Sequence, residues 1–285
     1  RLEYRGYDSA GIATIQNGAI GRRRAEGKLA NLDARLREEA LPGTTGIGHT
    51  RWATHGIPNE VNAHPHSTDR VAVVHNGIIE NFKELRAELV ELGHVLTSDT
   101  DTEVLLHVID RYLQEGLSPQ GATGAALKRL KGAFALGIIF AGETKLMIGA
   151  RRGSPLAIGI GDGEMFLGSD AIALAPLTKS IIYLDDGDWA VLTDTDYTIY
   201  DETGQEVVRE VRQTALTGAA IGKGGYRHFM LKEIYEQPQV IGDTLHSYVN
   251  PVTRAVSLPG LGFDPVTVTR LTLIACGTSY YACLT

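Results

Sequence analysis

Four of the nine histidines in this 285-residue chain fall within eighteen residues, HTRWATHGIPNEVNAHPH (49–66), and His75 follows shortly after. Such a density of imidazoles suggests a metal site, but the spacing argues against one. The stretch has no His-Glu-x-x-His pattern, and His64 and His66 place their rings on opposite sides of an extended chain. No cysteine or acidic cluster completes four ligands nearby. We therefore expect no metal site in this protein, and we predict that these histidines order the loop by hydrogen bonding to its backbone.

Arg51 and Asp101 are a more informative pair. An arginine fork fits a carboxylate with two parallel hydrogen bonds, and an aspartate near a helix start can accept from an ammonium group. A free α-amino acid carries both of these groups. Taken singly, each residue is more often a surface or capping charge, and the sequence does not show whether the two lie close together.

Two short patterns could bind oxygen atoms of a substrate. Asn76-Gly77 follows an apolar run, and it indicates either a simple turn or an oxyanion hole made by an amide side chain and a backbone N–H. Cys276-Gly-Thr-Ser279 leads into a helix start, where free backbone N–H groups and two hydroxyls could hold a phosphate. Neither pattern alone decides between structure and function.

The spacing of apolar residues predicts the helices and strands that position these candidate residues. Apolar runs predict strands at 10–16 and 71–79, the second broken by an Asn-Gly turn. A helix is predicted from Phe82 to Leu92, closed by Gly93, and a second from about 102 to 115, with Thr100 and Glu103 forming a capping box. Seven short apolar runs with brief connections then predict antiparallel strands at 133–140, 145–151, 156–161, 165–169, 180–184, 189–193 and 197–201.

These elements predict an α+β layered domain over residues 1–216. The glycine-rich segment 217–225 lacks large apolar side chains and is predicted to be a linker. After it we expect a helix interrupted at Pro238, a buried strand over 268–275 and a new helix, which is the beginning of an α/β domain over 226–285.

Composition narrows the function classes. The formal charge of −7 and the isoelectric point near 5.7 provide no basic surface, so we expect no nucleic-acid partner. No apolar run reaches about 18 residues and no charged-then-apolar leader opens the chain, so we expect no membrane association and a cytoplasmic location. The two cysteines, Cys276 and Cys283, do not form a disulfide framework.

Taken in order, several segments resemble the glutamine–fructose-6-phosphate aminotransferase (isomerizing) family, a branch of the class II glutamine amidotransferases. They are RLEYRGYDSAGIA, GHTRWATHG, NAHPH, VVHNGIIENF, SDTDTE, GSPLAIG, YRHFMLKEIYEQP and ACGTSYYA. The resemblance implies an N-terminal-nucleophile hydrolase fold, an αββα sandwich, followed by the start of a sugar-isomerase (SIS) domain. It also implies glutamine and fructose 6-phosphate as substrates, glucosamine 6-phosphate as product, no cofactor, and a homo-oligomer.

The resemblance also implies roles for individual residues. Arg51 and Asp101 would hold the α-carboxylate and α-ammonium of glutamine, and Asn76 and Gly77 would form the oxyanion hole. The remaining implied residues are Thr54 and His55 in the pocket, Trp52 in a loop over glutamine, Arg5 near the nucleophile, and Thr278 and Ser279 at the sugar phosphate.

One departure from the family concerns the nucleophile. The family uses the thiol of an N-terminal cysteine, whereas this sequence begins with Arg1, and Cys276 and Cys283 lie in the other predicted domain. We therefore expect a fragment that does not hydrolyse glutamine by itself. Two alternatives remain: a non-catalytic amino-acid-binding module, and a class II amidotransferase with another acceptor.

Overall fold

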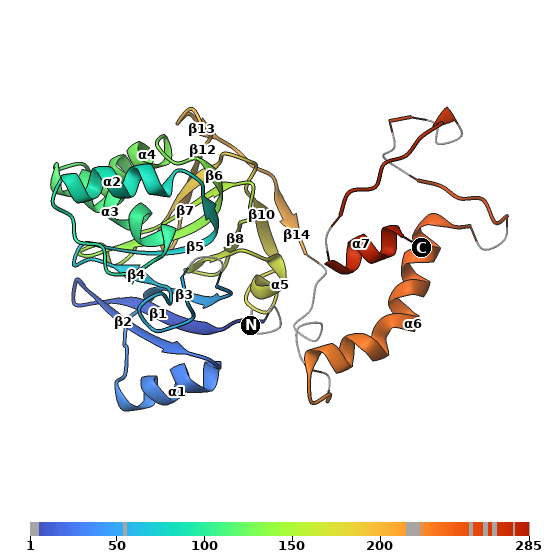
Figure 1. Cartoon of the computed structure of the whole chain (residues 1–285), viewed down its shortest axis with the longest axis horizontal. Coiled ribbons are helices and arrows are strands. Elements are labelled where there is room, and N and C mark those ends of the chain that lie inside the picture. The colour runs from blue at the N-terminus through green and yellow to red at the C-terminus, as the bar shows by residue number, and fades with distance from the viewer. Residues whose placement is uncertain are drawn as a thin grey trace. The chain divides into compact units, whose positions relative to one another are not determined.

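The structure is a computed structural model that describes residues 6–53, 56–214, 223, 225–250, 253–258, 262–263, 267–275 and 277–284 (Figure 1). The chain forms two compact units, Arg1–Gly222 and Lys223–Thr285. Their boundary falls within the segment 217–225 that the sequence marks as a linker.

A seven-stranded antiparallel sheet forms the centre of the first unit. Its strand order is β13-β12-β11-β7-β6-β5-β4. The interior strand β6 reads GAFALGIIF, and its residues from Phe134 onward are buried because both faces of the sheet are covered. The bounds are β4 His66–Ser67, β5 Val71–Ile79, β6 Gly132–Phe140, β7 Met147–Arg152, β11 Trp189–Leu192, β12 Tyr197–Tyr200 and β13 Glu206–Val207.

Three helices cover one face of this sheet (Figure 1). They are α2 Phe82–Glu91, α3 Asp101–Gln114 and α4 Pro119–Leu127, and their apolar side chains form one core cluster with β5, β6 and β7. The predicted cap of α3 is confirmed, because the Thr100 side chain accepts from the Glu103 backbone N–H. The reciprocal bond differs from the prediction, since the Glu103 carboxylate accepts from Thr97 and Ser98.

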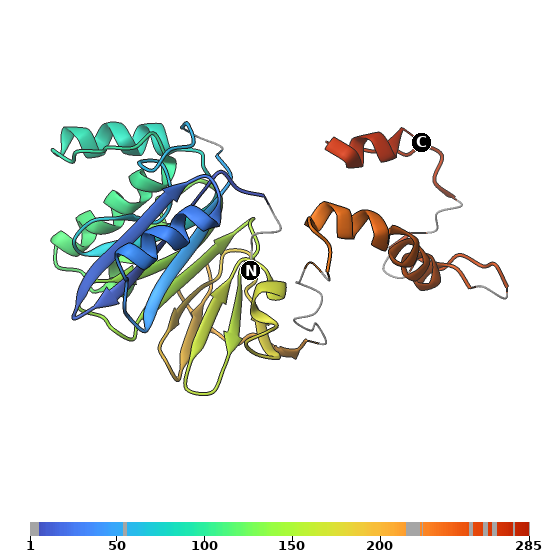
Figure 2. The same ribbon diagram turned by 90° about the horizontal axis from the view of Figure 1, so that it is seen from below.

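Two smaller antiparallel sheets pack on the other face of the seven-stranded sheet (Figure 2). One has the order β2-β1-β3 and the other β14-β10-β8-β9. Helices α1 Leu29–Glu38 and α5 Ala171–Leu174 cover their outer sides, which completes four layers in the order helix, sheet, sheet, helix. The strand bounds are β1 Ser9–Gln16, β2 Ala19–Glu26, β3 Thr45–Arg51, β8 Ala157–Ile160, β9 Met165–Gly168, β10 Ser180–Tyr183 and β14 Val211–Gln213.

The predicted strands between 133 and 201 are therefore all present, and they pair antiparallel as expected. The predicted αββα sandwich has one sheet in each of its two inner layers. In the structure, the described residues of the second inner layer form two separate sheets. The division lies between β3 and β9, which are the edge strands of the two smaller sheets. Residues of both edges line one cavity.

The second unit contains two described helices, α6 Phe229–Tyr248 and α7 Gly277–Cys283. Two predictions fail here. Helix α6 continues through Pro238 rather than stopping there. Residues 268–275 form no strand and pair with no other described segment. Within the described residues, no helix is long and apolar enough to cross a membrane.

Candidate functional site

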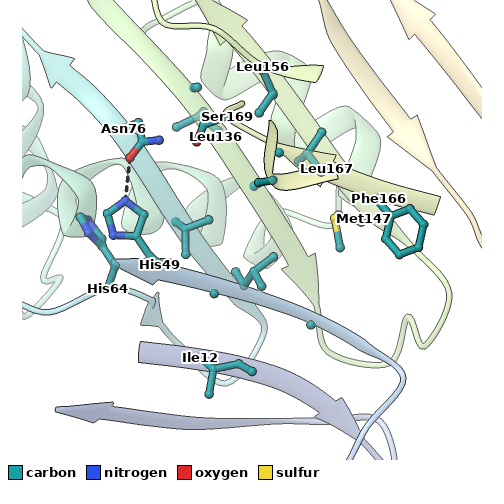
Figure 3. Close-up of a pocket in the computed structure, with 18 of the residues that line it drawn as sticks. Ile12, His49, His64, Asn76, Leu136, Met147, Leu156, Phe166, Leu167 and Ser169 are labelled. Atoms are coloured by element: carbon teal, nitrogen blue, oxygen red, sulfur yellow. Dashed lines mark hydrogen bonds between the residues drawn. The ribbon is translucent and has the colours of Figure 1, made fainter. Parts of the chain in front are cut away.

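The cavity between β3 and β9 has a volume of about 1450 Å³. Its walls include β5 and β6 of the central sheet, the start of α3, and both free strand edges (Figure 3). Five candidate site residues singled out from the sequence line it together: Arg51, Trp52, Asn76, Gly77 and Asp101. Residues separated by up to fifty positions along the chain thus share one site.

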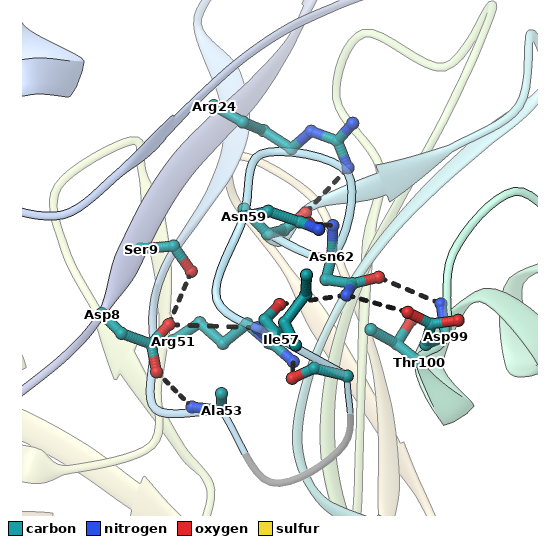
Figure 4. A network of polar contacts seen from close by, with 12 residues as sticks. Asp8, Ser9, Arg24, Arg51, Ala53, Ile57, Asn59, Asn62, Asp99 and Thr100 are labelled. Atoms are coloured by element: carbon teal, nitrogen blue, oxygen red, sulfur yellow. Dashed lines mark hydrogen bonds and ion pairs between the residues drawn. The ribbon is translucent and has the colours of Figure 1, made fainter.

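Arg51 is the last residue of β3 and only 3% exposed. Its guanidinium lies 3.9 Å from the Asp8 carboxylate and donates to the Gly56 carbonyl at 3.4 Å (Figure 4). Burial lowers the pKa of Arg51, and the charges of Asp8 and Asp101 oppose that shift. An arginine keeps its proton in such surroundings, so the cavity contains a buried cation.

Hydrogen bonds join the loop after β3 to the segment before α3 (Figure 4). The Asn62 amide donates to the Ile57 carbonyl at 3.0 Å and to the Asp99 carboxylate at 3.3 Å, while its oxygen accepts from the Asp99 N–H at 3.0 Å. The Asn62 backbone N–H donates to Asn59 at 2.8 Å. These bonds fix the positions from which Arg51 and Asp101 reach the cavity.

Asp101 is the first residue of α3 and 4% exposed. One of its oxygens accepts from the Ile79 backbone N–H at 2.8 Å, which ties the helix start to the end of β5. The other oxygen is 3.9 Å from Nδ1 of His75. The cavity therefore has a carboxylate as well as a guanidinium on its walls.

Asn76 and Gly77 lie inside β5, which runs without interruption from Val71 to Ile79. The predicted Asn-Gly turn is wrong, because both residues pair with β6, opposite Ala135 and Phe134. Gly77 has φ +126°, and a Cβ there would lie 2.1 Å from the Ala133 carbonyl oxygen. Only glycine fits this close approach of two strands.

His49 fixes the orientation of the Asn76 amide. Its Nε2 lies 2.7 Å from Oδ1 of Asn76, so the imidazole carries its proton on Nε2 and donates it (Figure 3). Burial lowers the pKa of His49 to about 4, which keeps the ring neutral at physiological pH. With its oxygen held in this way, Asn76 has its NH₂ group available as a donor elsewhere.

The other histidines of the stretch form a buried network. His64 Nε2 is 2.7 Å and His75 Nδ1 is 3.0 Å from the Thr102 hydroxyl, and His66 Nε2 is 3.0 Å from the Thr100 hydroxyl. The predicted partners were backbone groups, whereas these partners are side chains at the start of α3. Burial lowers the pKa of His66 to about 3 and that of His64 well below its ordinary value.

The remaining predicted site residues have different outcomes. Trp52 lies on the cavity wall just after β3 and is 70% exposed. Arg5, Thr54 and His55 lie outside the described residues, as does the side chain of Thr278. Ser279 is exposed on α7 of the second unit.

Sequence reasoning missed the roles of Asp8, His49 and Thr102 in orienting the site. Asp8 also accepts from the Ala53 N–H, so it holds both the arginine and the loop that follows. Alternation along the strand gives a signal for His49, since it lies two residues before Arg51, on the same face of β3.

The model of the glutamine amidotransferase domain family matches residues 35–227. The chain belongs to this family. The solved glutamine phosphoribosylpyrophosphate amidotransferase of B. subtilis, complexed with ADP and GMP, has the same fold over 70% of this chain and 44% of its own, with a TM-score of 0.60 and 25% identity. The class II amidotransferase fold predicted for the first unit is thus confirmed.

Curated relatives of this amidotransferase domain agree with the predicted resemblance. The glutamine–fructose-6-phosphate aminotransferase [isomerizing] of Bradyrhizobium diazoefficiens is 60% identical over 283 residues, 99% of this chain and 46% of the relative. The enzyme of that name from Gluconobacter oxydans is 56% identical over the same shares. The chain is therefore a homologue of these aminotransferases and spans about half of their length.

Proposed function

We propose that the first unit binds free glutamine and, in the complete enzyme, releases ammonia from its side-chain amide for transfer to fructose 6-phosphate. One observation carries the proposal: Arg51, Asp101, Asn76 and Gly77 line a single cavity. These residues offer one cation, one anion and two neutral N–H donors. Free glutamine has the matching groups, namely a carboxylate, an ammonium and an amide oxygen.

In this proposal the two charged residues recognise the amino-acid end. The Arg51 guanidinium binds the α-carboxylate, and Asp8 beside it limits the rotation of the arginine. Asp101 accepts from the α-ammonium with the oxygen that is not bound to the Ile79 N–H. Both side chains are already buried and held, so little conformational freedom is lost when glutamine binds.

The amide end then lies at Asn76 and Gly77. The Asn76 NH₂ and the Gly77 backbone N–H would stabilise negative charge on the amide oxygen as a thiolate attacks the carbon. Ammonia leaves after protonation, and water hydrolyses the thioester to glutamate. His49 contributes by holding the Asn76 oxygen and so presenting the NH₂ group.

A thiol nucleophile must come from outside residues 1–222, which contain no cysteine. We therefore expect a polypeptide of this sequence to bind glutamine without hydrolysing it. The same fact favours the second candidate function, a glutamine-binding module without catalysis. The sugar-isomerase role of residues 226–285, sugar-phosphate binding by Thr278 and Ser279, the homo-oligomer and the cytoplasmic location belong to the proposal for the complete enzyme.

Calorimetric titration of the chain with glutamine tests the binding step. We expect Arg51→Lys and Asp101→Asn each to weaken binding by roughly tenfold or more, because each removes a charge-assisted hydrogen bond at a buried site. Arg37→Lys and Asp33→Asn provide matched controls on α1, where both side chains are mostly exposed, at 78% and 61%. N-acetylglutamine, which lacks the ammonium group, should bind the parent chain weakly.

The proposal fails if glutamine does not bind, or if all four variants bind it as the parent chain does. Thermal melting of each variant separates lost binding from lost folding, which matters for Asp101 because it also anchors β5. Measurable glutamate production by the chain alone would contradict the assignment of the nucleophile.

A further inference from the structure

His94, His107 and Asp110 converge at a second pocket, of about 330 Å³, whose lining includes none of the glutamine-site residues. His107 and Asp110 are three residues apart on α3 and therefore lie on one face of that helix. His94 follows Gly93, the residue with φ +86° just beyond α2. The turn after α2 thus brings the third side chain to the face of α3.

The distances among these side chains suit a small metal ion. Nδ1 of His94 and Nδ1 of His107 are 3.2 Å apart, and the ligand atoms of all three residues lie within 4.8 Å of one another. Two nitrogens bound tetrahedrally to zinc at ordinary bond lengths are about 3.3 Å apart. The rings are nearly perpendicular, at 78° with centroids 5.2 Å apart, so both can direct Nδ1 toward one point.

The protonation state also suits coordination. Burial lowers the pKa of His107, an effect that the Glu103 charge opposes and His94 reinforces. A neutral imidazole is the form that binds a metal, so protons compete weakly at neutral pH. Without a metal, the Nδ1–H of one ring donates to the Nδ1 of the other. Coordination by both Nδ1 atoms requires each ring to carry its proton on Nε2. One ring therefore changes tautomer, and no net proton is released.

The surroundings of Asp110 orient its carboxylate and restrict the choice of ion. Arg70 donates to both oxygens at 2.9 and 3.1 Å, Thr68 donates at 2.8 Å and Gln114 at 2.6 Å. Such partners hold ligating carboxylates in place in known metal sites. Arg70 pairs with Asp110, so the three converging side chains offer two neutral imidazoles and one charge-paired carboxylate. This ligand set suits zinc, nickel or copper better than Mg²⁺ or Ca²⁺, which prefer oxygen ligands.

We propose that His94, His107 and Asp110 form a binding site for one divalent transition-metal ion of the zinc class. The two imidazoles supply Nδ1, and Asp110 supplies the oxygen that Gln114 now occupies, after that amide rotates away. The site joins the end of α2 to α3 and is independent of the glutamine proposal. It departs from the expectation of no metal site, which was argued from the histidine-rich stretch and His75.

The 285-residue chain, stripped with EDTA, would be titrated with ZnCl₂ by calorimetry in a non-coordinating buffer. We expect one saturable site per chain, and His94→Ala and His107→Ala should each weaken it by at least about tenfold. His246→Ala is the matched control, because it removes an exposed histidine from α6 in the second unit. A Cys276→Ser/Cys283→Ser variant tests binding by the thiols and should keep the site.

Cobalt(II) absorption in the visible provides a second measurement. A band in the parent chain that disappears in His94→Ala, with unchanged circular dichroism, supports the site even if His107→Ala unfolds, since His94 lies outside the helix. The proposal is overturned if the parent chain binds neither ion, if His94→Ala binds as the parent does, or if the cysteine variant abolishes binding.

Discussion

The two units of the chain use similar apolar side chains in opposite ways. In the first unit, Phe134, Leu105 and Ile138 are at most 2% exposed, whereas Leu271 and Ile274 of the second unit are 73% and 92% exposed. No described residue of the second unit is fully buried. A periodic pattern of apolar residues is therefore not enough to form a hydrophobic core, because the apolar face of a helix or strand must also pack against a second layer. Changes at packed positions should affect the first unit strongly and the second unit weakly.

The largest contrast is expected at two glycines. In Gly77→Ala the new methyl group meets the Ala133 carbonyl oxygen at 2.1 Å, at a φ of +126°, so β5 and β6 must separate. We expect a loss of more than about 4 kcal/mol in the free energy of unfolding. Gly242→Ala lies in α6 with nothing within 4 Å, and it should stabilise that helix by about 1 kcal/mol.

Urea unfolding followed by the fluorescence of buried Trp189 measures the first change, and circular dichroism at 222 nm measures the second. The expected contrast between the two units is contradicted if Gly77→Ala has the same urea midpoint of unfolding as the parent chain. It also breaks if Gly242→Ala lowers helicity, which would mean that α6 packs more tightly than its exposed side chains indicate.

The next largest effect is expected from pH. His49, His64 and His66 have folded-state pKa values below the ordinary 6.5, at about 4 for His49 and about 3 for His66. Between pH 6.5 and 4 the unfolded chain binds more protons, so the stability from these residues is present above pH 6.5 and is lost as pH falls. Lowering the pH from 7.5 to 5.5 should cost about 4 kcal/mol for the three together.

Urea midpoints at the two pH values check this expectation. The exposed His246 of the second unit provides the control, since His246→Asn should leave the pH dependence of the first unit unchanged. A first unit equally stable at pH 7.5 and 5.5 would contradict the neutral, buried network.

The same contrast explains how far the sequence could be interpreted. The strands between 133 and 201 were predictable because short apolar runs separated by turn residues are compatible with few secondary structures other than antiparallel strands. The turn at Asn76-Gly77 was wrongly predicted, because the local Asn-Gly signal was overridden by pairing with Ala135 and Phe134 of β6, which are distant in the sequence. Strand β2 was missed since its sequence AIGRRRAE is polar, as an edge strand permits.

The candidate site was predictable residue by residue but not as an arrangement. Arg51 and Asp101 followed from their chemistry and from the resemblance, yet their meeting in one cavity depends on β3, β5 and α3 together. The cluster of His94, His107 and Asp110 was missed because His94 and His107 are thirteen residues apart and follow no known spacing. The strand predicted over 268–275 shows the reverse error, in which a good local pattern lacks a partner in the described part of its unit.

The smallest expected effect concerns helix starts and should act in opposite directions in the two units. Ser118 caps α4 by accepting from the Gly121 N–H, whereas His228 at the start of α6 makes no side-chain cap bond. Ser118→Ala should therefore destabilise the first unit by about 1 kcal/mol, measured by the Trp189 urea midpoint. His228→Ser should slow amide hydrogen exchange in the first turn of α6 by a corresponding factor of about five. Because His228 already has the extended backbone of a cap residue, at φ −133° and ψ 148°, a serine needs no rearrangement there. Unchanged exchange would mean that α6 is limited by missing contacts along its apolar face rather than by its first turn.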